Sequence, residues 1–255
     1  MIHKASHHFD LVNWWLNAMP ETVMGFGRLA FYGKENATKR GETVKYDRYT
    51  GNDTEGDPFA YKLDEQSESV RKLYLESEKY DGYHRDQNVF GEGITIEDTM
   101  SVLVKYRTGV TLNYSLNAFL PREGYHVSFN GTQGRLEYTE DHSSHIITGD
   151  SEEQLAAATA WKNRCMILPM FGKAYEVPIP KATGGHGGAD PLLQARIFEE
   201  PEQPDELDRD AGHAQGAAAA LIGIAANQCF ETGQPVNIAD LCSEFNGAVH
   251  LTDVP

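Results

Sequence analysis

The strongest constraint on the fold is a block of alternating apolar and polar residues between Asp98 and Tyr138. Successive side chains of a strand point to opposite faces of a sheet, so a period of two predicts half-buried strands. Four segments share this pattern: MSVLVKY, GVTLNYSLNAF, GYHVSFNG and GRLEY. The breaks between them, RTG, PREG and GTQG, contain the Gly and Pro residues that turns require. We therefore predict a β-meander over residues 98–138.

Helical patterns flank this block on both sides. Residues 3–17 predict a helix, and residues 22–32 alternate and are rich in aromatic side chains, which predicts a strand. Near the other end, an Ala-rich helix is followed by Gly233 as its C-cap, then by a short strand and a short helix near Asp240. This order predicts an α+β domain over residues 1–255, with an open, predominantly antiparallel mixed sheet and helices packed on one face.

The remaining segments are less regular. Residues 33–66 are polar and predict a long loop, and residues 67–79 predict a short amphipathic helix. Further strands are expected at 145–149 and 174–180. Residues 199–210 are acidic and contain proline, which indicates a solvated surface loop.

Composition excludes several classes of partner. The chain has 22 Lys and Arg against 38 Asp and Glu, a formal net charge of −16. Such a surface repels phosphate backbones and anionic lipids, so we expect no nucleic-acid and no membrane partner. Neutral polar ligands such as sugars remain compatible. Three cysteines without a C-x-x-C pair predict free thiols, and the N-terminus lacks a signal peptide, so we expect a cytoplasmic protein.

The densest polar cluster lies within the first ten residues: His3, Lys4, His7, His8 and Asp10. On a helix His3, His7 and Asp10 share one face, and Lys4 and His8 lie on the neighbouring stripe. Apolar residues away from these two stripes can anchor the helix in a core: Phe9, Val12 and Leu16. An anchored helix that presents imidazole, ammonium and carboxylate groups can hold a proton-transfer site. Surface or capping roles remain open, as does a metal site formed by His3, His7 and Asp10.

Two further segments combine polar residues with glycine. In GGHGGAD, residues 184–190, four glycines surround His186, and Asp190 precedes Pro191 as a potential N-cap of a helix. In GYHRDQNVFG, Tyr83 and Arg85 could hydrogen-bond a polyol, because a guanidinium is a rigid fork of donors. For both segments an ordinary surface loop is an equally available interpretation.

A third glycine pattern is misleading. Gly25, Gly27 and Ala30 match G-x-G-x-x-A, but a dinucleotide loop must follow a strand and open a helix. Here the motif lies inside a predicted strand, and a helix precedes it. We therefore predict no cofactor-binding loop in this chain.

Four segments, in order along the chain, resemble the C-terminal domain of the Gfo/Idh/MocA oxidoreductases: HKASHHFDLVNWWL, VLVKYRTGVTLNYSL, VSFNGTQGRLEY and ALIGIAANQCFETGQPVNIADL. The resemblance implies an α/β domain with an open sheet that commonly mediates oligomerisation. It also implies a Rossmann domain that binds NAD or NADP and whose glycine-rich loop is not part of this chain. The segments around His186 and Arg85 resemble a sugar-related branch of the family.

The resemblance also implies roles for individual residues. His7 and Asp10 match the family's H-x-x-D motif, which makes His7 the acid/base of hydride transfer. Many members have an aspartate four residues before that histidine, where this chain has His3. We therefore expect Lys4 to orient or protonate the substrate oxygen. His3, His8, Asp10, Tyr83, Arg85, His186 and Asp190 are the candidates for substrate contact.

The expected function is that of the substrate domain of an NAD(P)-dependent oxidoreductase acting on a sugar, a polyol or a derivative. Met1 precedes the candidate helix almost directly, so we expect a truncated chain, a misplaced start codon or a split gene, and a polypeptide that is inactive alone. Three alternatives remain: a glycoside hydrolase of the same family that uses NAD transiently, a non-catalytic dimerisation or binding module, and a metal hydrolase.

Overall fold

The computed structural model describes residues 1–143, 162–180, 185–199 and 203–254. The chain divides into two compact units, one formed by Met1–Phe119 with Asp205–Pro255 and the other by Leu120–Pro204. Both units combine helices with a sheet whose strands pair in antiparallel fashion, which confirms the predicted α+β class. No helix in the described ranges combines the length and apolar character needed to span a membrane.

The first unit contains a four-stranded sheet in the order β3-β2-β1-β8. Its strands are β1 (Pro20–Arg28), β2 (Thr99–Tyr106), β3 (Thr111–Asn117) and β8 (Val236–Asn237). All neighbouring pairs are antiparallel, with Val23 opposite Val104 in the centre. In β2 buried and exposed residues alternate without exception after Thr99, as the period of two predicts.

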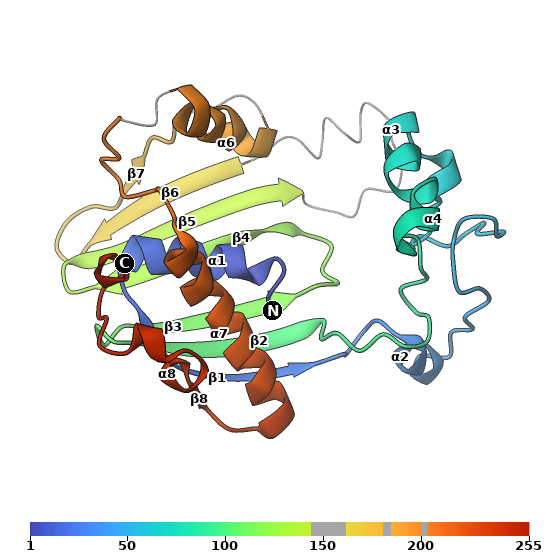
Figure 1. Ribbon diagram of the computed structural model, residues 1–255, viewed down its shortest axis with the longest axis horizontal. Coiled ribbons are helices and arrows are strands. Elements are labelled where there is room, and N and C mark those ends of the chain that lie inside the picture. Colours follow the sequence, from blue (N-terminus) through green and yellow to red (C-terminus); the bar gives the residue numbers. More distant parts are fainter. Residues whose placement is uncertain (144–161, 181–184, 200–202, 255) are drawn as a thin grey trace. The chain divides into compact units, whose positions relative to one another are not determined.

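Two helices cover one face of this sheet: α1 (Ala5–Leu16) and α7 (His213–Thr232) (Figure 1). Phe9 and Ile222 are fully buried between helices and sheet, together with the alanines of α7. Alanine has no bulk beyond its Cβ, so α7 can approach the strands closely. Gly233 ends α7 in the left-handed conformation, and α8 (Ile238–Leu241) follows, as predicted. Two short turns complete the unit: η4 (Ser243–Phe245) and η5 (Leu251–Asp253).

The opposite face of the sheet carries two exposed apolar side chains. Phe26 is 68% exposed and Leu103 is 48% exposed. The assembly of copies through this open face remains a prediction.

Both glycines of the G-x-G-x-x-A motif lie in β1, as the predicted strand requires, and its Ala30 follows the strand. A Cβ atom built on Gly25 would lie 3.0 Å from the ring of Phe230, and one on Gly27 would lie 2.8 Å from it. The two glycines are therefore packing positions that let the end of α7 approach the strand.

A long excursion separates β1 from β2. It contains α2 (Lys34–Lys39), η1 (Leu63–Glu65), α3 (Glu68–Val70), the π-helical turn η2 (Arg71–Leu75) and α4 (Glu78–Asp81). The helix predicted over residues 67–79 is thus present, but in three short pieces. The loop predicted over residues 33–66 is mostly irregular, with one helix at its start.

Asp98 anchors the beginning of this excursion to β2. Asp98 is buried, with 1% of the residue exposed. Its carboxylate accepts hydrogen bonds from the backbone N–H groups of Ala30, Phe31 and Tyr32 at 2.7–2.9 Å. Burial raises the pKa of Asp98, but these donors outweigh burial and hold it below its ordinary value. The turn that leaves β1 is therefore fixed by the charged residue that immediately precedes the neighbouring strand β2.

The second unit contains a sheet in the order β4-β5-β6-β7. Its strands are β4 (Glu123–Gly131), β5 (Gly134–Ser143), β6 (Lys162–Pro169) and β7 (Tyr175–Val177), and α6 (Gly185–Gln194) and η3 (Ala195–Glu199) follow. The strand predicted at 145–149 lies outside the described residues, and the one at 174–180 is confirmed by β7.

The predicted meander needs one correction. All four of its strands form, but β2 and β3 belong to the first sheet and β4 and β5 to the second, so β3 and β4 are not paired. The five-residue connection between them contains Pro121, which has no N–H to donate to a ladder. Ala118 N–H donates to Asp98 O, which extends the pairing of β3 with β2 by one hydrogen bond before the chain leaves the first sheet.

A second correction concerns residues 185–194. The predicted helix start at Asp190 and Pro191 is wrong, since α6 begins at Gly185 and contains Pro191. The helix is irregular before the proline, where Gly188 has φ +94°. Glycine tolerates this left-handed geometry, and the missing N–H of Pro191 leaves no helical bond to the carbonyl four residues earlier.

Candidate functional site

Helix α1 is anchored as predicted, with Phe9 and Val12 buried in the core. His7 is exposed on the outer side of the helix, and Lys4 is exposed at its N-cap. His3 precedes the helix, which begins at Ala5, so the helical stripe predicted from His3 starts only at His7. The anchored helix therefore holds the imidazole of His7 open to solvent.

His8 differs from its neighbour. Its Nδ1 lies 2.9 Å from the hydroxyl of Tyr114 on β3, and the two rings are 5.9 Å apart. Burial lowers the pKa of His8, and the charges of His7 and Lys4 lower it further. A neutral imidazole bound to the sheet fits a packing role better than proton transfer, so His7 is the better candidate for an acid/base.

Asp10 lies one helical turn after His7 and is half-buried. Burial raises the pKa of Asp10, and the nearby His7 partly opposes this rise. Asp10 is therefore a partly desolvated carboxyl group beside His7, and it can form a hydrogen bond with a ligand.

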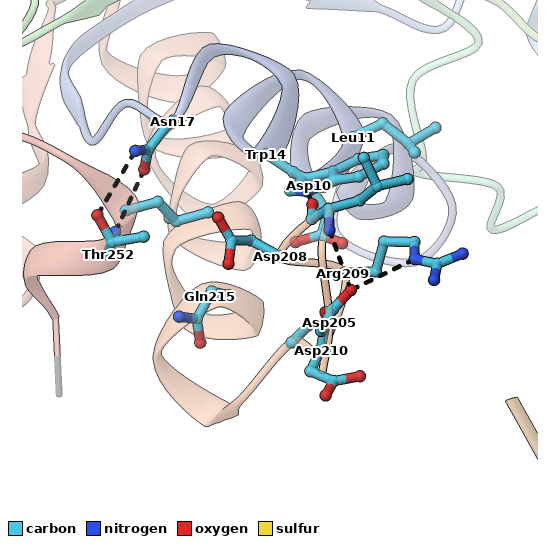
Figure 2. Close-up of a pocket in the computed structure, with 13 residues that line it drawn as sticks. Asp10, Leu11, Trp14, Asn17, Asp205, Asp208, Arg209, Asp210, Gln215 and Thr252 are labelled. Atoms are coloured by element: carbon cyan, nitrogen blue, oxygen red, sulfur yellow. Dashed lines mark hydrogen bonds and ion pairs between the residues drawn. The ribbon is translucent and has the colours of Figure 1, made fainter. Parts of the chain in front are cut away.

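A cavity of about 480 Å³ lies beside Asp10, along the face of α1 that carries Asp10 and Trp14 (Figure 2). Its walls come from four parts of the first unit: α1, the segment 205–211, the start of α7 and the C-terminal turn. The lining residues are Asp10, Leu11, Trp14, Asn17, Asp205, Leu207, Asp208, Arg209, Asp210, Ala211, Gln215, Leu251 and Thr252. This volume is within the range of small-molecule sites.

Hydrogen bonds hold the segment 205–210 against α1. The indole Nε1 of Trp14 donates to the carbonyl of Leu207 at 2.8 Å. Asp205 accepts from the backbone N–H of Asp210 at 2.6 Å and from Arg209 Nε at 3.5 Å. Residues 203–210 are irregular and exposed except at Asp205, as expected for a solvated surface loop, and residues 205 and 207–210 also form a wall of the cavity. The polar composition of the loop does not reveal this contact, so sequence could not predict the wall.

The cavity combines an indole with carboxylate and amide side chains. Asn17 and Thr252 already bond each other, through Asn17 Nδ2 at 3.5 Å and Thr252 N–H at 3.3 Å. Carboxylates accept hydrogen bonds from hydroxyl groups, side-chain amides both accept and donate them, and an aromatic face packs against the C–H groups of a sugar ring. The lining therefore suits a small hydroxylated ligand. Sequence analysis missed Asp205, Asp208 and Gln215 as wall residues.

The structure gathers few of the predicted site residues. Of the nine candidates, Asp10 lines the cavity and His7 lies one turn before it. Tyr83 and Arg85 follow α4 in the excursion, and neither lines the cavity. His186 and Asp190 belong to α6 in the second unit.

Two patterns considered in the sequence, the metal cluster and the glycine motif, can be located in the structure. Among the described residues, no group of three or more His, Cys, Asp or Glu side chains is arranged so that it could hold a metal ion. The predicted set of His3, His7 and Asp10 is therefore not such a group. The glycines of the G-x-G-x-x-A motif face Phe230, so they do not fit the phosphates of a dinucleotide.

Comparison with known proteins identifies the family. Residues 1–238 match the model of the oxidoreductase family, C-terminal alpha/beta domain. The chain is 32% identical to the oxidoreductase YteT of Bacillus subtilis (strain 168) over 248 residues, which cover 94% of this chain and 56% of YteT. The chain thus spans about half the length of this curated relative.

One of the solved structures compared has the same fold at low sequence identity. An NADPH-dependent oxidoreductase of Desulfitobacterium hafniense DCB-2 superposes with a TM-score of 0.51 and 11% identity, over 93% of this chain and 47% of that one. The aldose-aldose oxidoreductase of Caulobacter crescentus, complexed with glycerol, superposes with a TM-score of 0.48 and 10% identity, over 91% of this chain and 45% of that one. Because the family model spans nearly the whole chain and YteT is 32% identical to it, the chain belongs to the Gfo/Idh/MocA oxidoreductase family and corresponds to its C-terminal α/β domain.

Proposed function

We propose that the chain is the substrate-binding part of an NAD(P)-dependent oxidoreductase that acts on a sugar, a polyol or a derivative, with His7 as the acid/base. The main support is the placement of an exposed His7 one turn before Asp10, whose half-buried carboxylate lines a cavity. Family membership supports the reaction class, and the mixture of polar groups and an indole in the cavity supports a hydroxylated substrate.

The proposed chemistry assigns a separate task to each residue. Oxidation of an alcohol removes the hydroxyl proton as well as a hydride, and His7 accepts that proton because imidazole titrates near neutral pH. Asp10 stabilises the imidazolium that results, and Lys4, at the same end of α1, orients the substrate oxygen. The NAD(P) of the family supplies the hydride-accepting chemistry.

A chimera tests this proposal. The 255 residues would be joined to the part of YteT that they do not align with, and NAD(P)H formation would be followed by absorbance with a panel of sugars and polyols. We expect sugar-dependent activity, reduced at least about 100-fold by His7→Gln, since general acid–base catalysis contributes about 10²–10⁴-fold. His126→Gln, which changes a histidine of β4 in the second unit, is the matched control.

Ligand binding to the unmodified chain keeps the test informative if the chimera does not fold. Sugars that bind should perturb the NMR signals of His7 and Trp14 in the wild type. Full activity of the His7→Gln chimera would refute the assigned role. Release of an aglycone without net oxidation would instead identify a glycoside hydrolase.

A further inference from the structure

Arg85 has an unusual environment for this acidic chain. Six other arginines pair with carboxylates: Arg40, Arg48, Arg122, Arg135, Arg164 and Arg209. Among the described residues no carboxylate pairs with Arg85, whose guanidinium carbon lies 4.4 Å from the ring centroid of Tyr74 and 6.0 Å from that of Tyr61. Because the side chain is also exposed, its charge is available to an anion from solution.

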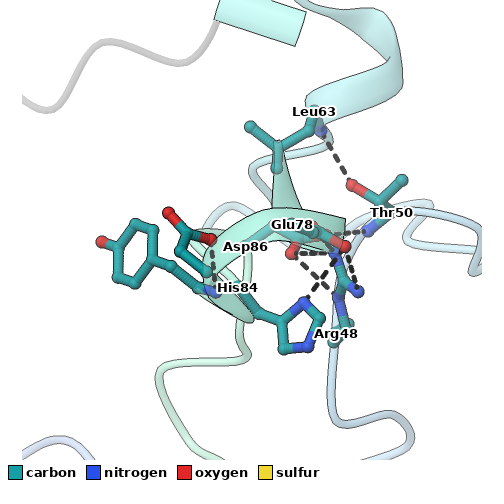
Figure 3. A network of polar contacts seen from close by, with 8 residues as sticks. Arg48, Thr50, Leu63, Glu78, His84 and Asp86 are labelled. Atoms are coloured by element: carbon teal, nitrogen blue, oxygen red, sulfur yellow. Dashed lines mark hydrogen bonds and ion pairs between the residues drawn. The ribbon is translucent and has the colours of Figure 1, made fainter. Parts of the chain in front are cut away.

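The residue after Arg85 is held firmly (Figure 3). Asp86, whose side chain is fully buried, accepts hydrogen bonds from Arg48 Nε at 2.9 Å and Nη2 at 2.7 Å. On the other side, His84 Nδ1 lies 3.1 Å from a carboxylate oxygen of Glu78. Because Asp86 fixes the backbone next to Arg85, less backbone freedom is lost when a ligand binds, which lowers the entropic cost of binding.

Tyrosines surround the guanidinium. Tyr83 is 53% exposed and Tyr61 is 37% exposed, and the rings of Tyr74 and Tyr83 are 6.4 Å apart. One side-chain hydrogen bond joins Arg85 to Tyr61. A guanidinium has five N–H donors, so the remaining donors at its edge can bind a carboxylate through two parallel hydrogen bonds. The exposed phenol rings can pack against sugar C–H groups, and their hydroxyls can bond sugar hydroxyls.

We propose that Arg85, with Tyr61, Tyr74 and Tyr83, forms a binding surface for a sugar acid, with its carboxylate on the guanidinium and its ring against the tyrosines. None of these four residues lines the cavity beside Asp10. The surface is therefore a second site, and it does not depend on the oxidoreductase function proposed above.

Isothermal titration calorimetry on the 255-residue chain tests the proposal with three probes: galacturonate, the neutral sugar galactose, and acetate. Galacturonate should bind most tightly, and Arg85→Gln should weaken it at least tenfold. Arg85→Lys should retain part of the affinity, because it keeps the charge but loses the planar fork. Arg28→Gln is the matched control, since Arg28 is also exposed and has no carboxylate partner among the described residues, but lies in β1.

The outcomes separate the components of the site. Undiminished galacturonate binding by Arg85→Gln would overturn the role of Arg85, and equal binding of galactose would overturn the role of the carboxylate. Acetate binding as tight as galacturonate would overturn the part assigned to the sugar ring, and absence of galacturonate binding to the wild type would refute the whole proposal. Circular dichroism of each variant establishes that it is folded. Arg85→Gln leaves the His7 site intact, so the two proposals can fail separately.

Discussion

Asp10 on α1 and Asp86 in the excursion are both shielded carboxylates, yet their surroundings differ. Asp86 accepts hydrogen bonds from Arg48 and from the backbone N–H of Thr50, and these outweigh the effect of burial and lower its pKa. No described residue donates a hydrogen bond to the Asp10 carboxylate, and burial raises its pKa. A carboxylate with its donors in place holds a fold together, whereas one without them is free to serve a ligand or a neighbouring histidine.

The largest expected effect is on stability at Asp86. Asp86→Ala removes the buried one of the two carboxylates that pair with Arg48, the other being that of Glu78, and leaves the partly buried N–H of Thr50 without its acceptor. Breaking a buried ion pair costs about 3–5 kcal/mol, and the partial exposure of Arg48 places the expected loss near 3 kcal/mol. Urea unfolding measures it.

Asp64→Ala is the matched control, because Asp64 is exposed in η1. Its unfolding free energy should change by less than about 0.5 kcal/mol.

Asp10→Asn should leave the unfolding free energy unchanged or raise it slightly, since it removes a desolvated charge. A loss at Asp10 as large as that at Asp86 would contradict the contrast between the two regions.

A smaller effect is expected from Trp14→Phe, which keeps a ring at the cavity but loses the hydrogen bond to Leu207. One such bond contributes about 1 kcal/mol. Hydrogen exchange of the backbone amides in residues 205–210 should accelerate, because this segment loses its tether to α1. Trp15→Phe, on the more exposed neighbour, should change the exchange less; equal changes would show that the indole donor does not hold the wall.

The smallest expected effect is a difference between the pKa values of Asp86 and Asp10, measured from the pH dependence of their side-chain carboxyl NMR signals. Asp86 should titrate below the ordinary value of 3.8 and Asp10 above it. Asp86 therefore contributes stability that is present above pH 3.8 and is lost as pH falls through its folded pKa. For Asp10 the sign is opposite: its contribution is present below pH 3.8 and is lost as pH rises through its folded pKa. The reverse order of midpoints would be inconsistent with the two environments described.

Much of the site could be predicted near α1, because helical periodicity governs it. The spacing of Phe9 and Val12 predicts which face is buried, and that leaves His7 on the other side. The cavity wall could not be predicted, since residues 205–210 follow α1 by almost two hundred positions and contact it through a backbone carbonyl. The network around Arg48 was likewise hidden, because Arg48, Glu78 and Asp86 come together only in the folded excursion.

Local patterns along the chain were enough to place β1 through β5, the first and last long helices, and the family to which the chain belongs. Only the folded chain separates the expected meander into two sheets and assigns a pKa direction to each carboxylate. The reason is physical: strand and helix periods depend on neighbours in sequence, whereas strand pairing, burial and hydrogen-bond donors depend on residues that are distant in sequence and meet only in three dimensions.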